Sequence, residues 1–281
     1  MNSAPLRGFF FRLRCGKIYF MRKNIFIATF SYGAVDVIKE NQLNIEINHT
    51  CISEELNPDN REKLLAAIRR DIEDSGAKRV ILHGPFTEII PAAIDGRARD
   101  FAKQRLEEAY EVCREIGAEG MVVHTGWVPF MYFKEWQAEK GAIFWQDFMK
   151  DKPENFRIFV ENVLDDEPYM LANMMKQIDD PRIGLCLDVG HALAAGHNAI
   201  GMEEWIRVLG PYLMHFHIHN NHGDRDAHGA LSQEDGVLDF HEVFRWIRQY
   251  CRPDVTFTIE SRDCASAVRW LTENDYLTPC I

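Results

Sequence analysis

The chain has 281 residues, a formal net charge of -11 and a hydrophobic content of 46%. No uninterrupted apolar run approaches the roughly 18 residues that span a bilayer, so we expect a soluble, cytoplasmic protein with a sizeable core. The acidic balance argues against a nucleic-acid partner without excluding one, because a basic cleft can lie on an acidic protein. The seven cysteines are odd in number and lack C-x-x-C spacing, which is typical of reduced intracellular proteins.

Residues 1–20 read MNSAPLRGFFFRLRCGKIYF, and the Arg and Lys residues in this stretch make it a poor signal peptide. The first convincing strand begins just after Met21. We therefore predict that residues 1–20 are a non-native or disordered extension and that residues 21–281 form one domain. A genuine N-terminal arm is the alternative.

Short apolar runs alternate with longer helical stretches along the rest of the chain. The runs predicted to be strands span residues 24–30, 43–48, 79–83, 120–124, 157–161, 183–188, 213–217 and 256–260. Helices are predicted over residues 58–75, 98–116, 144–149, 168–178, 202–209, 240–250 and 265–273. The connection between the first two strands is unusually short.

These strands are nearly continuous apolar runs, as expected when both faces of a parallel sheet are buried. Eight strand–helix units in about 260 residues match the size of a (β/α)8 barrel. The sequence therefore predicts an α/β protein with a single TIM-barrel domain. A doubly wound open sheet is the alternative, but no predicted strand–turn–helix carries a Gly-rich dinucleotide fingerprint.

Six of the predicted strands end in a residue type that binds metal ions. These residues are His83, His124, Glu161, Asp188, His217 and Glu260. The C-terminal ends of barrel strands converge on one face, where active sites are built. Gathering carboxylates and imidazoles there without a cation costs on the order of several kcal/mol in desolvation and repulsion. We therefore predict a divalent metal, and the mixed His and carboxylate donors favour Zn²⁺, Mn²⁺, Fe²⁺ or Co²⁺.

Further donors flank these strand ends. The segment DVGH places His191 on the loop directly above the sixth strand. The seventh strand continues into HIHNNHGDRDAH, in which His219 shares a face with His217 by strand alternation, and Asp226 and His228 follow on the loop. A D-x-H pair can direct both of its side chains toward one ion, although the motif alone is weak.

Three other residues near the strand ends are predicted to have different roles. His215 shares the face of His217 one layer lower, which favours a core or supporting position. Cys186 and Cys264 lie close to the strand ends and are predicted to be packing residues.

In order along the chain, the motifs are LHGPF, VVHTGW, FVENV, LDVGHALAAG, HFHIHNN, GDRDAHGAL, DGVLDF and FTIES. With these motifs the chain resembles the xylose isomerase-like TIM-barrel superfamily over residues 24–271. That superfamily includes sugar isomerases and epimerases, inosose dehydratases and endonuclease IV-type apurinic-site nucleases. The motifs are specific for the superfamily and poorly specific for one reaction.

The resemblance implies a metal site with up to nine ligands. Glu161, Asp188, His217 and Glu260 are similar to the four-ligand site of the sugar epimerases, in which the two glutamates are also the catalytic acid and base. The ligands that complete a three-metal cluster in the endonuclease IV branch correspond to His83, His124, His191, Asp226 and His228. One to three Zn²⁺ or Mn²⁺ ions are therefore expected. Asn220 departs from the pattern, since many relatives have Asp there.

The leading functional hypothesis is an isomerase or epimerase of a small sugar-like carbonyl compound. Glu161 and Glu260 would exchange protons with the two faces of the substrate, while a metal stabilises the enediolate. The residues expected to contact the substrate are Trp127, His191, His219 and Arg262. The aromatic residues that follow Trp127 are expected either to line the site or to pack on the barrel or on a second subunit of a homo-oligomer.

The alternative hypothesis is a multi-metal phosphodiesterase that acts on abasic DNA. The strand-end loops supply few cations for a DNA footprint: Arg97, Arg99, Lys134, Lys140, Arg225 and Arg262. The loop NHTCISEELNPDN is acidic, which also argues against DNA. A barrel that binds a ligand without turnover is the third possibility, and the complete ligand set argues against it.

Overall fold

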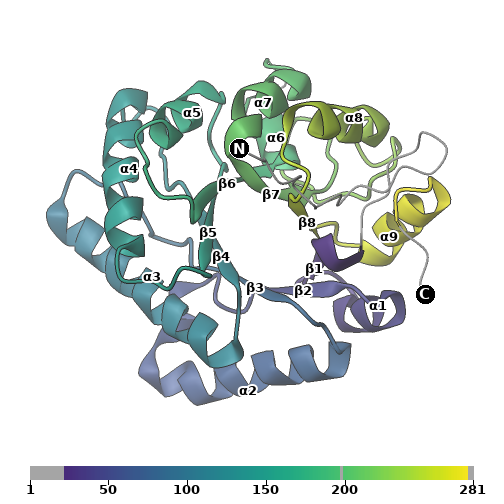
Figure 1. Cartoon of the computed structure of the whole chain (residues 1–281), viewed down its shortest axis with the longest axis horizontal. Coiled ribbons are helices and arrows are strands. Elements are labelled where there is room, and N and C mark those ends of the chain that lie inside the picture. The colour runs from purple at the N-terminus through teal and green to yellow at the C-terminus, as the bar shows by residue number, and fades with distance from the viewer. Residues whose placement is uncertain (1–21, 197–198, 278–281) are drawn as a thin grey trace, which may run out of the picture.

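In a computed structural model, which describes residues 22–196 and 199–277, parallel strands close into a central barrel surrounded by helices (Figure 1). The strands are β1 (Ile25–Ala28), β2 (Asn44–Ile47), β3 (Val80–His83), β4 (Gly120–His124), β5 (Arg157–Glu161), β6 (Ile183–Asp188), β7 (Leu213–Ile218) and β8 (Thr256–Ile259). The prediction for residues 1–20 lies outside the described residues.

Each strand pairs in parallel with the next, and β1 also pairs with β8. In that closing pair Ile25 lies opposite Phe257 and Ile27 lies opposite Ile259. Because the first and last strands are hydrogen-bonded to each other, the sheet has no free edge and the open doubly wound alternative is wrong. The predicted (β/α)8 barrel is confirmed.

Helices follow the strands in the described part of the chain. They are α1 (Ala34–Asn41), α2 (Pro58–Ser75), α3 (Gly96–Ile116), α4 (Lys134–Met149), α5 (Tyr169–Met175), α6 (Val189–Ala195), α7 (Met202–Leu209), α8 (Phe240–Tyr250) and α9 (Cys264–Glu273). Short 3-10 turns lie at Arg22–Asn24, Ser53–Leu56 and Gly210–Tyr212. None of the helices in these residues is long and apolar enough to cross a membrane.

Three of these helices differ from the sequence prediction. Helix α1 occupies the connection that was expected only to be unusually short. Helix α4 begins ten residues before the predicted position 144, at Lys134. Its first turns bury Gln137, Ala138 and Gly141, whose polar or small side chains hide the apolar period. Helix α6 was predicted as a loop, because a seven-residue helix that starts with Val-Gly-His carries no amphipathic signal.

An apolar layer closes the lower part of the barrel interior. Phe26, Ile81, Val122, Phe159 and Cys186, from five different strands, form this cluster. The larger core lies between the strands and the helices. Polar side chains above the apolar layer therefore pack against it, which limits their movement and excludes water from the lower end of the barrel.

Candidate functional site

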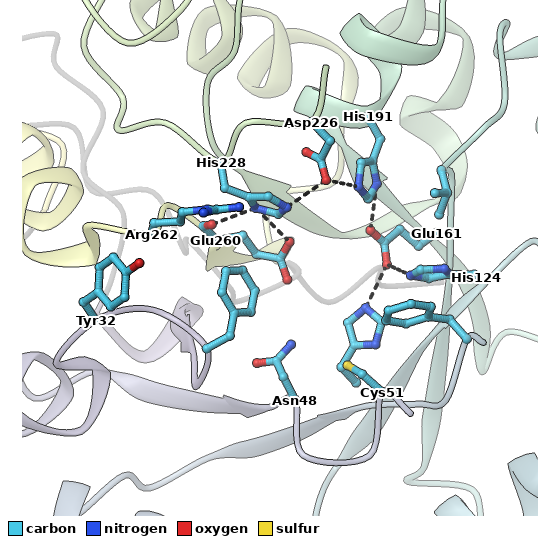
Figure 2. Close-up of a pocket in the computed structure, with 14 residues that line it drawn as sticks. Tyr32, Asn48, Cys51, His124, Glu161, His191, Asp226, His228, Glu260 and Arg262 are labelled. Carbon is cyan, nitrogen blue, oxygen red and sulfur yellow. Dashed lines mark hydrogen bonds and ion pairs between the residues drawn. The ribbon is translucent and has the colours of Figure 1, made fainter. Parts of the chain in front are cut away.

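A cavity of about 580 Å³ opens at the C-terminal ends of the strands (Figure 2). The residues that line it are Phe30, Tyr32, Asn48, Cys51, His83, Phe86, His124, Glu161, Val163, His191, Asp226, His228, Glu260 and Arg262. Seven of the nine predicted metal ligands are in this lining. The other two, Asp188 and His217, are fully buried.

Glu161, at the end of β5, lies at the centre of the donor set. Its Oε2 is 3.3 Å from Nε2 of His83 and 3.4 Å from Nε2 of His124. Its Oε1 is 3.1 Å from Nδ1 of His217 and 3.3 Å from Nδ1 of His191. Imidazoles from four different elements thus surround one carboxylate, which is the arrangement expected of a ligand shared between ions.

A second group of donors lies around His217. Its Nδ1 is 3.4 Å from Glu260 Oε1 and 3.9 Å from Asp188 Oδ2. Asp188 is held from two sides, because its Oδ1 accepts a 2.6 Å hydrogen bond from the backbone N–H of His191 and lies 3.1 Å from His219 Nε2. The first of these bonds caps α6, so the helix start positions the carboxylate.

The third group joins α6 to the loop after β7. Asp226 Oδ2 is 3.3 Å from Nε2 of His191 and 2.9 Å from Nε2 of His228 (Figure 2). His191 was predicted to lie on a loop, but it lies on the first turn of α6. Gly190 permits this packing, since a Cβ there would come within 2.0 Å of the His219 ring. His228 has a φ of 51°, a left-handed conformation that the loop holds in place.

Three histidines in the cavity are oriented by backbone carbonyls. Nδ1 of His83 is 3.0 Å from the Gly84 oxygen, Nδ1 of His191 is 3.0 Å from the Asn162 oxygen, and Nδ1 of His228 is 2.8 Å from the Glu260 oxygen. A neutral imidazole that donates from Nδ1 has its lone pair on Nε2. These contacts therefore leave Nε2 of each ring available as a ligand atom.

The two glutamates have opposite pKa shifts. Burial alone would raise the pKa of Glu161, but the nearby His217, His124 and His191 hold it well below its usual value. Burial raises the pKa of Glu260, and the negative charges of Glu161 and Glu46 add to this rise, although His217 opposes it. The site thus contains one carboxyl whose pKa is lowered by nearby imidazoles and one whose pKa is raised by burial and neighbouring negative charges.

The chemistry of the donors fits a divalent metal. Donor atoms within 4.8 Å of one another occur in several sets, including His83 with His124 and Glu161, and His191 with Asp226 and His228. The Oε2 atom of Glu161 is buried and, within the described part of the chain, has no partner in hydrogen-bond geometry, although two imidazole nitrogens lie near it. Nitrogen and oxygen donors that converge on a common region are suited to hold a cation.

The predicted substrate contacts have different positions. His191 and Arg262 line the cavity. His219 is fully buried against Asp188 and does not line it. Trp127 is 5% exposed and packs in the core, where its indole N–H donates a 3.0 Å hydrogen bond to the Tyr132 oxygen. We therefore retain only His191 and Arg262 as candidate substrate contacts.

Sequence reasoning missed several residues of the site. The aromatic walls of the cavity are Phe30, Tyr32 and Phe86, which follow β1 and β3. These aromatic residues directly follow a strand, as the predicted histidine ligands directly end one. They were missed because only metal-binding residue types at the strand ends predicted a site. Glu46 was also missed, although a lone carboxylate within the apolar strand LNIEIN is itself unusual.

Comparison with known proteins agrees with this geometry. A sequence profile described as a xylose isomerase-like TIM barrel matches residues 27–278. The chain belongs to the xylose isomerase-like TIM-barrel family.

Relatives within this family have different names. The chain is 27% identical over 212 residues to an uncharacterised protein of Methanocaldococcus jannaschii, covering 71% of this chain and 70% of that protein. It is 25% identical over 200 residues to a protein of Mycobacterium leprae named probable endonuclease 4, covering 68% and 77%. These relatives do not distinguish which reaction of the family this chain performs.

Solved structures share the fold. A D-tagatose 3-epimerase-like protein superimposes with a TM-score of 0.68 at 23% identity, covering 89% of this chain and 96% of that one. A Thermus thermophilus protein, from a crystal soaked with ZnCl2, gives a TM-score of 0.66 at 21% identity, covering 89% and 97%.

In this xylose isomerase-like barrel a buried acid links the ends of β4 and β5. Asp165 is fully buried, and its Oδ2 accepts hydrogen bonds from the Thr125 hydroxyl at 2.9 Å and the Val163 N–H at 3.0 Å. Its Oδ1 has no hydrogen-bond partner among the residues that the structure describes. Burial raises the pKa of Asp165 to about 6.

The raised pKa predicts a pH-dependent stability contribution from Asp165. The protonated form favours folding, so the contribution is complete below the unfolded-state pKa of about 4 and is lost as pH rises through about 6. Asp165→Asn keeps an oxygen for both donors and removes the charge. We expect its free energy of unfolding, relative to wild type, to rise by about 3 kcal/mol between pH 4 and pH 8. Urea unfolding at several pH values measures this, and a pH-independent difference would contradict it.

Proposed function

We propose that the protein is a metal-dependent isomerase or epimerase of a small polyhydroxylated carbonyl compound. The observation that carries the proposal is a small cavity whose floor holds two glutamates with opposite pKa shifts, Glu161 and Glu260. Environments that separate the pKa values of two carboxyls are typical of acid–base pairs. The cavity volume is in the range of small-molecule sites. Similarity to a D-tagatose 3-epimerase-like structure supports the same class.

The residues that would hold the metal are those of the three donor groups. Glu161, Asp188, His217 and Glu260 would form the central site, and the remaining predicted ligands, His83, His124, His191, Asp226 and His228, would hold up to two further ions. A bound Zn²⁺ or Mn²⁺ ion supplies Lewis-acid polarisation of a carbonyl or hydroxyl oxygen.

The side chains of the protein would perform the proton transfers. Glu161, whose pKa is lowered, accepts a proton from the carbon next to the carbonyl, and Glu260, whose pKa is raised, returns one. Phe30 and Phe86 form apolar walls that exclude water from the reacting carbon. Arg262 is the single Lys or Arg in the lining formed by the described residues, and it orients a hydroxyl or an anionic group of the substrate.

The second candidate is hydrolysis of a phosphodiester, as the name of the Mycobacterium leprae relative suggests. The observation that favours it is the number of donors, because a single ion needs about four ligands and the site has sets for more than one. The scarcity of cations around the cavity argues against a long DNA substrate.

Solvent exchange tests the two candidates directly. The metal-loaded protein is incubated with a panel of aldoses and ketoses in deuterated water, and with abasic duplex DNA in a parallel reaction. An isomerase or epimerase incorporates deuterium at the carbon next to the carbonyl of one sugar. Efficient nicking of abasic DNA with no exchange in any sugar would select the hydrolase.

A further inference from the structure

His217 differs from His83, His191 and His228 because its Nδ1 faces only carboxylates in the described residues and no backbone carbonyl. Its Nδ1 faces the carboxylates of Glu161 and Glu260 at 3.1 and 3.4 Å. A neutral imidazole that uses Nδ1 as a ligand must carry its proton on Nε2. For His83, His191 and His228 a backbone carbonyl fixes the opposite tautomer. His217 therefore needs an acceptor on the lower side, inside the barrel.

Glu46 of β2 is the acceptor that faces this nitrogen. Its Oε1 lies 3.1 Å from His217 Nε2, and both side chains are fully buried. Their 3.1 Å contact is outside hydrogen-bond geometry, and neither atom has a hydrogen-bond partner in the described residues. A buried carboxylate and a buried N–H with no other partner are each costly, by roughly 1–3 kcal/mol or more, so their pairing is favoured.

The other oxygen of Glu46 is fixed by β8. The hydroxyl of Thr258 donates to Glu46 Oε2 and lies 2.9 Å from His215 Nε2. Nδ1 of His215 is in turn 2.6 Å from the hydroxyl of Thr256. These contacts form a hydrogen-bonded chain from Thr256 through His215 and Thr258 to Glu46.

We propose that Glu46 is a positioning residue that holds His217 in the Nε2–H tautomer and so directs the Nδ1 lone pair toward the metal centre. Such a carboxylate–histidine pair raises the basicity of the ligand and fixes its orientation. The inference rests on the metal-binding part of the proposed function and is independent of the substrate. It also assigns a role to the buried polar layer beneath the cavity, which the proposed reaction does not use.

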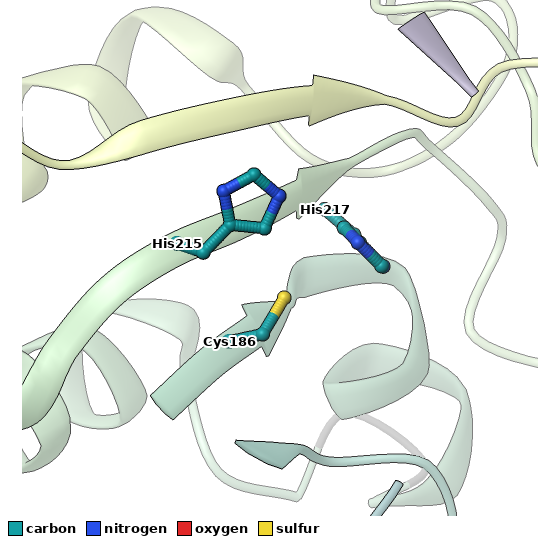
Figure 3. Close-up of side chains that lie close together, drawn as sticks. All are labelled: Cys186, His215 and His217. Atoms are coloured by element: carbon teal, nitrogen blue, oxygen red, sulfur yellow. The ribbon is translucent and has the colours of Figure 1, made fainter. Parts of the chain in front are cut away.

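Cys186 is the other polar neighbour of His217. Figure 3 shows its thiol on β6 beside His215 and His217 on β7, and these three residues could also be read as a ligand set. Both nitrogens of His215 already face threonine hydroxyls, however, and Cys186 belongs to the apolar layer. A thiol is a weak acceptor compared with a carboxylate. We therefore assign the orientation of His217 to Glu46.

The test compares Glu46→Gln with Cys186→Ala as a matched control, because both residues touch the same imidazole. In Glu46→Gln the Thr258 hydroxyl retains the amide oxygen, so the amide N–H2 faces His217 Nε2 and favours a proton on Nδ1. We expect the Zn²⁺ dissociation constant, measured by chelator competition, to rise about 10- to 100-fold. In the Zn²⁺-loaded protein, the Nε2–H proton of His217 is expected to give a far-downfield NMR signal in the wild type and to shift upfield in Glu46→Gln, because the carboxylate acceptor is lost. Cys186→Ala should keep the wild-type affinity and Nε2–H signal.

The Nε2–H signal separates this inference from the proposed function, because it needs no substrate. An affinity loss with an unchanged Nε2–H signal makes Glu46 a direct ligand and overturns the proposal, as does a wild-type affinity in Glu46→Gln. Should Glu46→Gln fail to fold, Thr258→Val removes the donor that orients Glu46. A smaller affinity loss and a smaller shift of the Nε2–H signal are then expected, and an unchanged His217 signal in Thr258→Val would refute the role.

Discussion

Glu260→Gln is expected to lower turnover by about 10²- to 10⁴-fold, the range that a positioned acid or base contributes. Gln keeps the size of the side chain but neither gives nor takes a proton. Glu161→Gln should have at least as large an effect, because Glu161 also contacts four imidazoles. Initial rates on the sugar found by deuterium exchange measure both variants. Glu119→Gln, at the opposite end of the barrel where Glu119 pairs with Arg79, is the matched control and should retain the wild-type rate.

Metal content must be measured in each of these variants, since both glutamates are predicted ligands. A variant that keeps its metal and loses exchange supports the acid–base assignment. If Glu260→Gln keeps its metal and exchanges the substrate proton at the wild-type rate, the assignment is wrong. If the wild-type protein nicks abasic duplex DNA at physiological salt and exchanges no sugar, the hydrolase is the correct function.

Metal loading is expected to stabilise the protein strongly. Purified protein should contain one to three divalent transition-metal ions per chain by elemental analysis. A ligand that binds only the folded state at 100 times its dissociation constant contributes about 2.7 kcal/mol, which corresponds to roughly 5–10 °C in Tm for a chain of this size. Chelation should therefore lower Tm by this amount, and adding Zn²⁺ or Mn²⁺ should restore it.

Two histidines of the same loop provide the matched comparison. His228 contacts Asp226 at 2.9 Å and lines the cavity, whereas His222 is exposed to solvent. His228→Ala should bind less metal and lose part of the Tm gain, while His222→Ala should match the wild type. No metal in the wild-type protein, together with no Tm change on adding Zn²⁺ or Mn²⁺, would rule out the metal centre.

The barrel could be predicted from the sequence because its signals are local. Each strand is a short apolar run, and each helix with a clear period, such as Pro58–Ser75, has its own boundaries. The C-terminal ends of parallel strands meet at one face by topology, so residues such as His83 and Glu161 could be placed together without coordinates. The start of helix α4 was missed because its first turns bury small and polar residues, which give no clear apolar period.

The roles of the individual site residues depend on distances between side chains on strands that are far apart in the sequence. Glu46 and His217 are separated by 171 positions, and only closure of the barrel brings their side chains to 3.1 Å. Packing likewise decided that Trp127 lies in the core and that Phe30 and Phe86 form the cavity walls. The sequence by itself therefore determined the fold and the residue types that gather at the C-terminal ends of the strands. The tertiary structure decided which nitrogen of each imidazole faces the centre, because an imidazole's orientation is set by the neighbours of both its nitrogens.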